Sequence, residues 1–108
     1  MSLTINLYYT GKNGSAQAFA KEMEESGLAQ QIRDEEGNES YRYFQPLDDP
    51  EAILLIDQWK DQQAIDQHHQ SPMMTQLAQL RDKYDLHMKV QRFTSISNNS
   101  GDEQYLRK

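Results

Sequence analysis

The segment at positions 52–59, AILLIDQW, restricts the possible folds of this chain more than any other feature. It is rich in β-forming residues, and its run from Ile53 to Ile56 is apolar on both sides of a strand instead of alternating with polar residues. Such a strand has to be covered on both faces. A chain of 108 residues, 36% of them hydrophobic, builds one domain with a modest core, so a partner's surface is one way to cover the second face.

The remaining patterns place strands and helices in a defined order. Strands are expected at 3–10, 39–47, 52–59 and 85–93. Helices are expected after the caps Ser15, Asp61 and Ser71, with a short extra turn of helix after Gly27. The order β-α-β-β-α-β is typical of ferredoxin-like α+β domains. We assign this domain to residues 1–94 and a polar C-terminal tail to residues 95–108.

In a ferredoxin-like domain the helices cover one face of the sheet and leave the other face bare. Because the strand at 52–59 is apolar on both faces, the bare faces of two subunits are expected to pack against each other. The sequence therefore predicts a homodimer formed by sheet-to-sheet packing.

Composition argues against several functional classes. The formal net charge is -6, and the 11 basic residues are scattered, which argues against nucleic-acid and anionic membrane partners. The absence of cysteine excludes disulfides, thiolate metal sites and cysteine nucleophiles. No P-loop pattern indicates a nucleotide cofactor. Without a signal-peptide pattern or a stretch long enough to cross a bilayer, a soluble cytoplasmic protein is expected.

The adjacent histidines His68 and His69 are the first candidates for chemistry. Neighbouring residues on a helix point about 100° apart, whereas a helical pair of metal ligands needs a spacing of three or four residues. His87 belongs to a different element, so no metal site is expected. Ile65 lies three residues before His68 and places this histidine on the inward helix face, as a general base or as a satisfied interior residue.

Trp59 ends the strand at 52–59, where its ring is either part of the core or the wall of a pocket for a flat aromatic ligand. Asn6 and Tyr8 are expected on the helix-facing side of the first strand, near Trp59, either solvated beside a pocket or hydrogen-bonded to a ligand. Four further side chains are most simply packing residues, although the methionines are compatible with a pocket lining: Met73, Met74, Leu77 and Leu80.

Two stretches carry a resemblance to a known family: EEGNESY at 35–41 and LLIDQWKDQQAIDQHHQSPMM at 54–74. The ordered features are an acidic-Gly-x-x-x-Tyr segment before a strand, a tryptophan closing the next strand, a helix with a histidine, and a Ser/Thr-Pro step. In these features the chain resembles the antibiotic biosynthesis monooxygenase (ABM) family, including its quinol monooxygenases. The resemblance extends from Leu3 to Phe93.

This resemblance implies a dimeric α+β barrel with a pocket between sheet and helices in each subunit. It also implies oxidation of an electron-rich aromatic by dioxygen with neither flavin nor metal. By position, His68 matches the family's helix histidine, Trp59 its strand tryptophan, and Asn6 the first-strand asparagine of some members. We therefore expect a cofactor-independent monooxygenase of a quinol or polyphenol with these three catalytic residues. The expected substrate pocket is lined by Tyr8, Ile65, Met73, Met74 and Leu77.

One departure from the family pattern leaves alternatives open. Many relatives have a histidine after the Ser/Thr-Pro step, where this chain has Met73, so any mechanism that needs a second pocket histidine is in doubt. Haem degradation, found elsewhere in the family, fits poorly because positions 76–80 contain no ligating histidine. A non-catalytic dimer that binds a small hydrophobic ligand, an isomerase of a small metabolite, and a purely structural role for His68 remain alternatives.

Overall fold

The structure, a computed structural model, describes residues 2–97 and 100–107. The strands are β1 (Leu3–Thr10), β2 (Asn38–Phe44), β3 (Ala52–Trp59) and β4 (His87–Thr94). The helices are α1 (Ser15–Glu25), α2 (Leu28–Arg33), α3 (Gln62–His69), α4 (Met73–Lys83) and a short 3-10 helix, η1 (Ser100–Tyr105). The predicted order of strands and helices is confirmed, and no described helix is long and apolar enough to cross a membrane.

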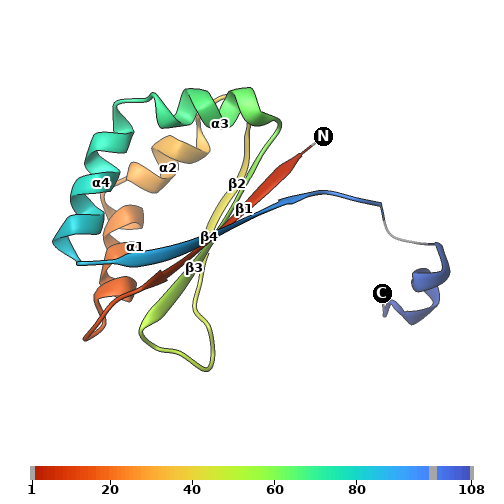
Figure 1. The fold of residues 1–108 in the computed structure, drawn as a ribbon, viewed down its shortest axis with the longest axis horizontal. Coiled ribbons are helices and arrows are strands. Elements are labelled where there is room, and N and C mark those ends of the chain that lie inside the picture. Colours follow the sequence, from red (N-terminus) through yellow and green to blue (C-terminus); the bar gives the residue numbers. More distant parts are fainter. Residues whose placement is uncertain (1, 98–99, 108) are drawn as a thin grey trace.

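All neighbouring strands of the sheet are antiparallel, and they lie in the order β2-β3-β1-β4. The helices lie on one side of this sheet (Figure 1). The ferredoxin-like α+β fold is therefore confirmed. In the pairing of the two central strands, Leu3 lies opposite Trp59 and Asn6 lies opposite Ile56.

The core lies between the helix-facing side of the sheet and the helices. Its largest fully buried side chains include Tyr9 from β1, Phe19 from α1, Tyr41 from β2 and Trp59 from β3. The apolar spacing that predicted α1 is confirmed, since Ala16, Phe19, Ala20 and Met23 are all buried. The rings of Tyr9 and Phe19 have centroids 5.1 Å apart, so aromatic contacts join the sheet to the first helix.

The expected position of Asn6 and Tyr8 is wrong. Strand alternation turns Ile5, Leu7 and Tyr9 toward the helices, where they are buried. Asn6 and Tyr8 therefore lie on the opposite face of the sheet, away from the helices. Trp59 lies on the helix-facing side, so Asn6 and Trp59 are separated by the sheet.

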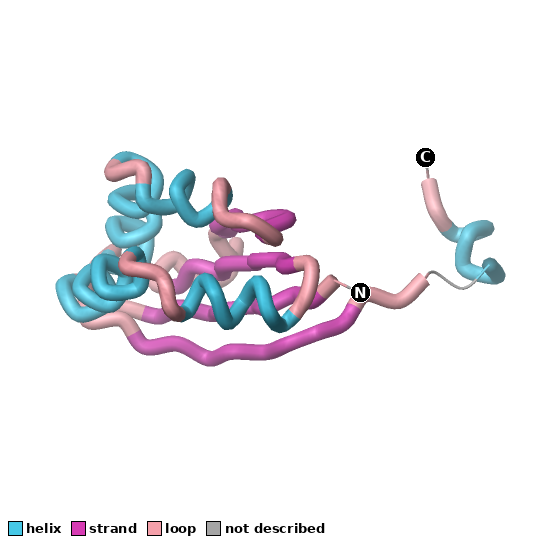
Figure 2. Tube along the Cα trace, turned by 90° about the horizontal axis from the view of Figure 1, so that it is seen from above, coloured by secondary structure: helices cyan, strands magenta, loops and turns pink. Residues whose placement is uncertain are grey.

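The second face of the sheet carries apolar side chains that no helix covers. Leu54 and Ile56 of β3 are partly buried there. Phe44 of β2, opposite Leu54, and Phe93 of β4, opposite Thr4, are exposed on the same face. The expectation that β3 is apolar on both faces is thus confirmed. Strand β4 is exposed along its whole length, at the outer edge of the sheet (Figure 2).

Two of the three expected helix caps differ from the prediction. Asp61 caps α3 as expected, because its Oδ1 accepts a hydrogen bond from the backbone N–H of Ala64 at 2.9 Å. Ser15 is instead the first residue of α1, after a left-handed Gly14, and its Oγ accepts from the backbone N–H of Lys12. At α4 the cap is Pro72, and the Oγ of Ser71 makes no hydrogen bond.

The described part of the C-terminal tail extends away from the sheet (Figure 1). It contains η1, a short helix that the polar sequence of this segment did not indicate. The division into a domain of residues 1–94 and a tail of residues 95–108 remains a prediction.

Substitution of Gly37, in the turn between α2 and β2, tests how closely this turn packs against α3. Its φ is +87°, and an added Cβ would lie 2.5 Å from the Cβ of Ala64. Gly27 has a similar φ of +85° but no neighbour within 4 Å, so Gly27→Ala is a matched control that carries only backbone strain. We expect Gly27→Ala to lower the free energy of unfolding in urea by about 1–2 kcal/mol, and Gly37→Ala to lower it by clearly more. Equal losses would contradict the close packing of this turn.

Candidate functional site

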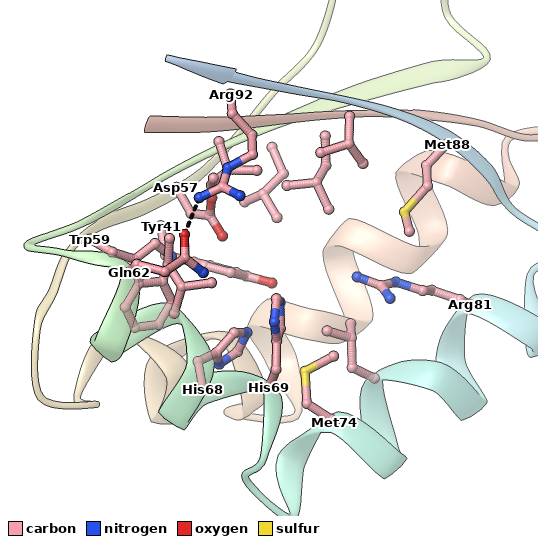
Figure 3. Close-up of a pocket in the computed structure, with 16 residues that line it drawn as sticks. Tyr41, Asp57, Trp59, Gln62, His68, His69, Met74, Arg81, Met88 and Arg92 are labelled. Atoms are coloured by element: carbon pink, nitrogen blue, oxygen red, sulfur yellow. Dashed lines mark hydrogen bonds between the residues drawn. The ribbon is translucent and has the colours of Figure 1, made fainter. Parts of the chain in front are cut away.

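A cavity of about 260 Å³ lies between the helix-facing side of the sheet and helices α3 and α4 (Figure 3). Strands β1, β3 and β4 and both helices contribute apolar side chains to its walls: Ile5, Leu7, Leu55, Ile65, Leu77 and Val90. Polar and aromatic side chains make up the rest of the lining, among them Asp57, Trp59, His68, Arg81 and Arg92. Such a combination is typical of a site for a small, mostly apolar ligand.

His68 is held at the cavity wall by an acidic residue from a distant part of the sequence. Its Nδ1 lies 2.6 Å from Oε2 of Glu35, and the side chains of both residues are largely buried. An ionised carboxylate can only accept a hydrogen bond, so Nδ1 carries the proton and the Nε2 of a neutral ring keeps a free lone pair. A carboxylate that orients a histidine in this way prepares the imidazole to take a proton.

Burial lowers the pKa of His68, while the carboxylate of Glu35 opposes this shift. Burial dominates, so the ring is neutral near pH 7. Because the neutral form is the one that accepts a proton, the environment favours the basic form of this histidine at neutral pH.

Trp59 forms an aromatic wall beside His68. The centroids of the Trp59 and His68 rings are 4.8 Å apart, with 31° between the ring planes. The ring centroid of His69 lies 5.6 Å from that of His68. Trp59 is almost fully buried, yet it lines the cavity. Trp59 therefore supports the ring of His68 at the cavity wall and exposes little of its own surface.

Asp57 is a buried carboxyl group on the same face of β3 as Trp59. Its side chain lies at the cavity wall, it is 6% exposed, and its Oδ1 has no hydrogen-bond partner. Burial raises the pKa of Asp57 to about 6, although a hydrogen bond with Trp59 and the positive charge of Arg81 act in the opposite direction.

Two arginines approach the cavity from α4 and β4 (Figure 3). The Nε and Nη2 of Arg81 both donate to the hydroxyl of Tyr9, at 3.1 and 2.9 Å, which fixes the side chain and leaves Nη1 outside these bonds. Arg92 donates to the side-chain oxygen of Gln62, across the opening between β4 and α3. The cavity thus has cationic groups on the side of α4 and β4.

The structure brings together some of the residues that the sequence singled out and separates others. His68, Trp59, Ile65, Met74 and Leu77 all line the cavity. Three predicted site residues do not line it: Asn6, Tyr8 and Met73. Met73 packs against the core instead, while Tyr8 lines a shallow depression on the other face of the sheet.

Several site residues were missed by sequence reasoning. Glu35 lies 33 positions before His68, and the only signal for it was its place in the EEGNESY segment. Asp57 belongs to the strand predicted at 52–59, but its role at a cavity was not predicted. Arg81 and Arg92 gave no signal, because each belongs to an otherwise ordinary helix or strand pattern. Among the described residues there is no cluster of three or more His, Cys, Asp or Glu side chains that could hold a metal ion.

The sequence profile of the antibiotic biosynthesis monooxygenase family matches residues 2–80. The chain belongs to this family. No curated protein matches it. The match includes Glu35, Asp57, Trp59 and His68, whereas Arg81 and Arg92 lie beyond the matched residues.

Solved structures of similar fold agree with the family assignment. SnoaB, a cofactor-independent oxygenase from Streptomyces nogalater, is 14% identical, with 92% of this chain and 97% of SnoaB covered and a TM-score of 0.74. PA3566 from Pseudomonas aeruginosa is 23% identical over 89% of this chain and 95% of its own, with a TM-score of 0.75. Rv0793 from Mycobacterium tuberculosis is 17% identical over 93% of this chain and 100% of its own, with a TM-score of 0.74. At these identities the likeness shows a shared fold.

The buried carboxyl of Asp57 predicts an unusual dependence of stability on pH. Because its pKa rises from 3.8 to about 6 on folding, the folded state holds this proton more tightly than the unfolded state. The ionised side chain then lowers the free energy of unfolding by up to about 3 kcal/mol above pH 6, and by little below pH 4. We expect Asp57→Asn to be more stable than the wild type in urea at pH 8, and the gain to shrink toward pH 4.

The control for this measurement is Asp66→Asn, at an exposed position of α3. It should change stability little at either pH, because an exposed carboxylate is well solvated. A wild type as stable as Asp57→Asn at pH 8 would show that the carboxyl of Asp57 is not destabilised by burial.

Proposed function

We propose that this protein is a monooxygenase that oxidises a small electron-rich aromatic, such as a quinol or polyphenol, with dioxygen and without a cofactor. The observation that carries this proposal is the buried Glu35–His68 pair, in which the carboxylate binds one ring nitrogen of a histidine that lines the cavity. Family membership and the fold shared with a cofactor-independent oxygenase support it.

The proposed reaction begins with proton transfer. His68 takes a phenolic proton through Nε2, and the resulting imidazolium is stabilised by the carboxylate of Glu35. The phenolate is a far better electron donor than the phenol, and it transfers an electron to dioxygen held beside it. Trp59 keeps the ring in place throughout.

The overall reaction balances without an external reductant. A hydroquinone and dioxygen give a hydroxyquinone and water: one oxygen atom forms the new C–O bond, and the other leaves as water with two hydrogens from the substrate. The substrate itself supplies all four electrons that dioxygen accepts. Asn6 has no part in this proposal, because it lies on the other face of the sheet.

Oxygen uptake with a panel of hydroquinones and polyphenols tests the proposal. We expect His68→Ala to reduce turnover by about 10²–10⁴-fold, because a positioned base is lost. The control is His87→Ala, whose side chain is exposed and outside the cavity, and which should leave turnover unchanged. Uptake that stays at the autoxidation background across the panel, combined with tight binding of the same compounds, would favour the ligand-binding alternative.

The pH profile gives an independent readout of the Glu35–His68 pair. His68 acts in its neutral form, and burial lowers its pKa, so the acidic limb of the turnover profile should lie below the pH at which an ordinary histidine titrates. Glu35→Gln removes the charge that raises this pKa, so the acidic limb should move to lower pH while maximal turnover decreases. An acidic limb at the same pH in both proteins would exclude His68 as the titrating base.

We further propose that two subunits pack through the bare faces of their sheets. Leu54 and Ile56 on the central strand, with Phe44 and Phe93 beside them, support this arrangement because the helices leave them uncovered. Ile56→Lys should convert a dimer into a monomer at micromolar concentration in light scattering. Gln76→Lys, which adds the same charge on the exposed side of α4, should leave the dimer intact. A monomeric wild type would contradict the proposal.

A further inference from the structure

Asp57 is a buried charged group of the cavity that the proposed reaction leaves unused. Its side chain is 94% buried, since its exposure is 6%, and its Oδ1 accepts no hydrogen bond from the protein. A buried polar atom without a partner costs free energy comparable to a lost hydrogen bond. Because Asp57 lies at the wall of a cavity in spite of this cost, its carboxyl group points to a ligand that supplies the missing partner.

The neighbouring cations do not supply that partner. Arg81 uses its Nε and Nη2 on the hydroxyl of Tyr9, and Arg92 uses its Nη2 on the side chain of Gln62. Neither arginine forms an ion pair with Asp57 among the described residues. Asp57 therefore lines the cavity with a carboxyl group that has one buried oxygen without a partner in the protein.

The same arginines restrict what the ligand's donor can be. An ammonium group at Asp57 would share the cavity with Arg81 and Arg92 and be repelled by both. A neutral hydroxyl donates a hydrogen bond without this repulsion. Hydroxyl recognition is therefore favoured over recognition of a cation.

Asp57 and His68 flank one aromatic wall. Trp59 stacks on the ring of His68 and also interacts through its side chain with the carboxyl of Asp57, two positions earlier on the same face of β3. A ligand in the cavity thus meets two acceptor groups in its walls, Asp57 and His68. One acceptor, His68, is the proposed base.

We propose that Asp57 is a specificity-determining residue that accepts a hydrogen bond from a second hydroxyl of the substrate, so that the cavity selects aromatic diols over compounds with a single hydroxyl. This assignment rests on the proposed function, because it concerns the substrate of the same cavity. His68 takes the proton of the hydroxyl that reacts, and Asp57 positions the other.

Anaerobic binding tests this assignment separately from turnover. The probes are 1,4-dihydroxynaphthalene and its monomethyl ether, 4-methoxy-1-naphthol, which lacks the second O–H. Trp59 is the only tryptophan of the chain and lines the cavity, so quenching of its fluorescence reports binding at this site. We expect the wild type to bind the diol at least about tenfold more tightly than the ether, as a hydrogen bond to a charged group predicts.

Asp57→Leu keeps a side chain of similar size and removes the acceptor, so the preference should fall to nearly none. Asp57→Asn retains an acceptor oxygen without the charge, so it should keep a smaller preference; it also serves as the second variant if Asp57→Leu folds poorly. Circular dichroism checks the fold of both. His87→Ala, outside the cavity, should bind both probes like the wild type.

The outcomes separate the two proposals. A diol preference that disappears in Asp57→Leu supports the assignment even if the protein consumes no oxygen, in which case only the proposed oxygenation fails. Oxygen uptake with an unchanged preference in Asp57→Leu overturns the assignment and leaves the proposed function standing. A wild type that binds neither probe, or both equally, also overturns it.

Discussion

The antiparallel pairing of β1 with β3 determines where every part of the cavity lies. Its register sets Leu3 opposite Trp59 and Leu7 opposite Leu55, so the apolar sides of both central strands lie beneath the helices. Since side chains alternate along a strand, a shift of one residue would turn Asp57 and Trp59 toward the other face. Burial of these strands therefore stabilises the core and also holds two polar site groups at the cavity wall.

The second constraint is the contact between the turn after α2 and the start of α3. The backbone N–H of Lys60 donates to the carbonyl of Gly37 at 2.8 Å, and Gly37 packs closely on Ala64. This contact holds Glu35 beside His68, although the two residues are far apart in sequence. The orientation of His68 by Glu35 thus depends on Gly37, which has no side chain and lets the turn after α2 approach the start of α3.

The sequence was informative where local patterns decide the structure. Strand β3 has its expected bounds because an apolar run between two turns favours a strand of that length. Asp61 caps α3 as expected, because its side chain is a good hydrogen-bond acceptor at a helix start. The alternation in β1 also indicated the correct face for Asn6, since Leu7 and Tyr9 mark the apolar side. The expectation that Asn6 and Tyr8 face the helices did not follow that alternation. Glu35 could not be assigned, because only the folded chain brings it to His68.

The charges of the cavity differ from those of the whole chain. The protein carries a formal charge of -6, yet Arg81 and Arg92 reach the cavity, where Asp57 is the acidic group. In the proposed reaction this contrast has a direct consequence. Proton transfer to His68 leaves a phenolate in a largely apolar space, where an unpaired anion would be costly. We expect the guanidinium groups of Arg81 and Arg92, which line the same cavity, to stabilise that anion, while Glu35 stabilises the imidazolium.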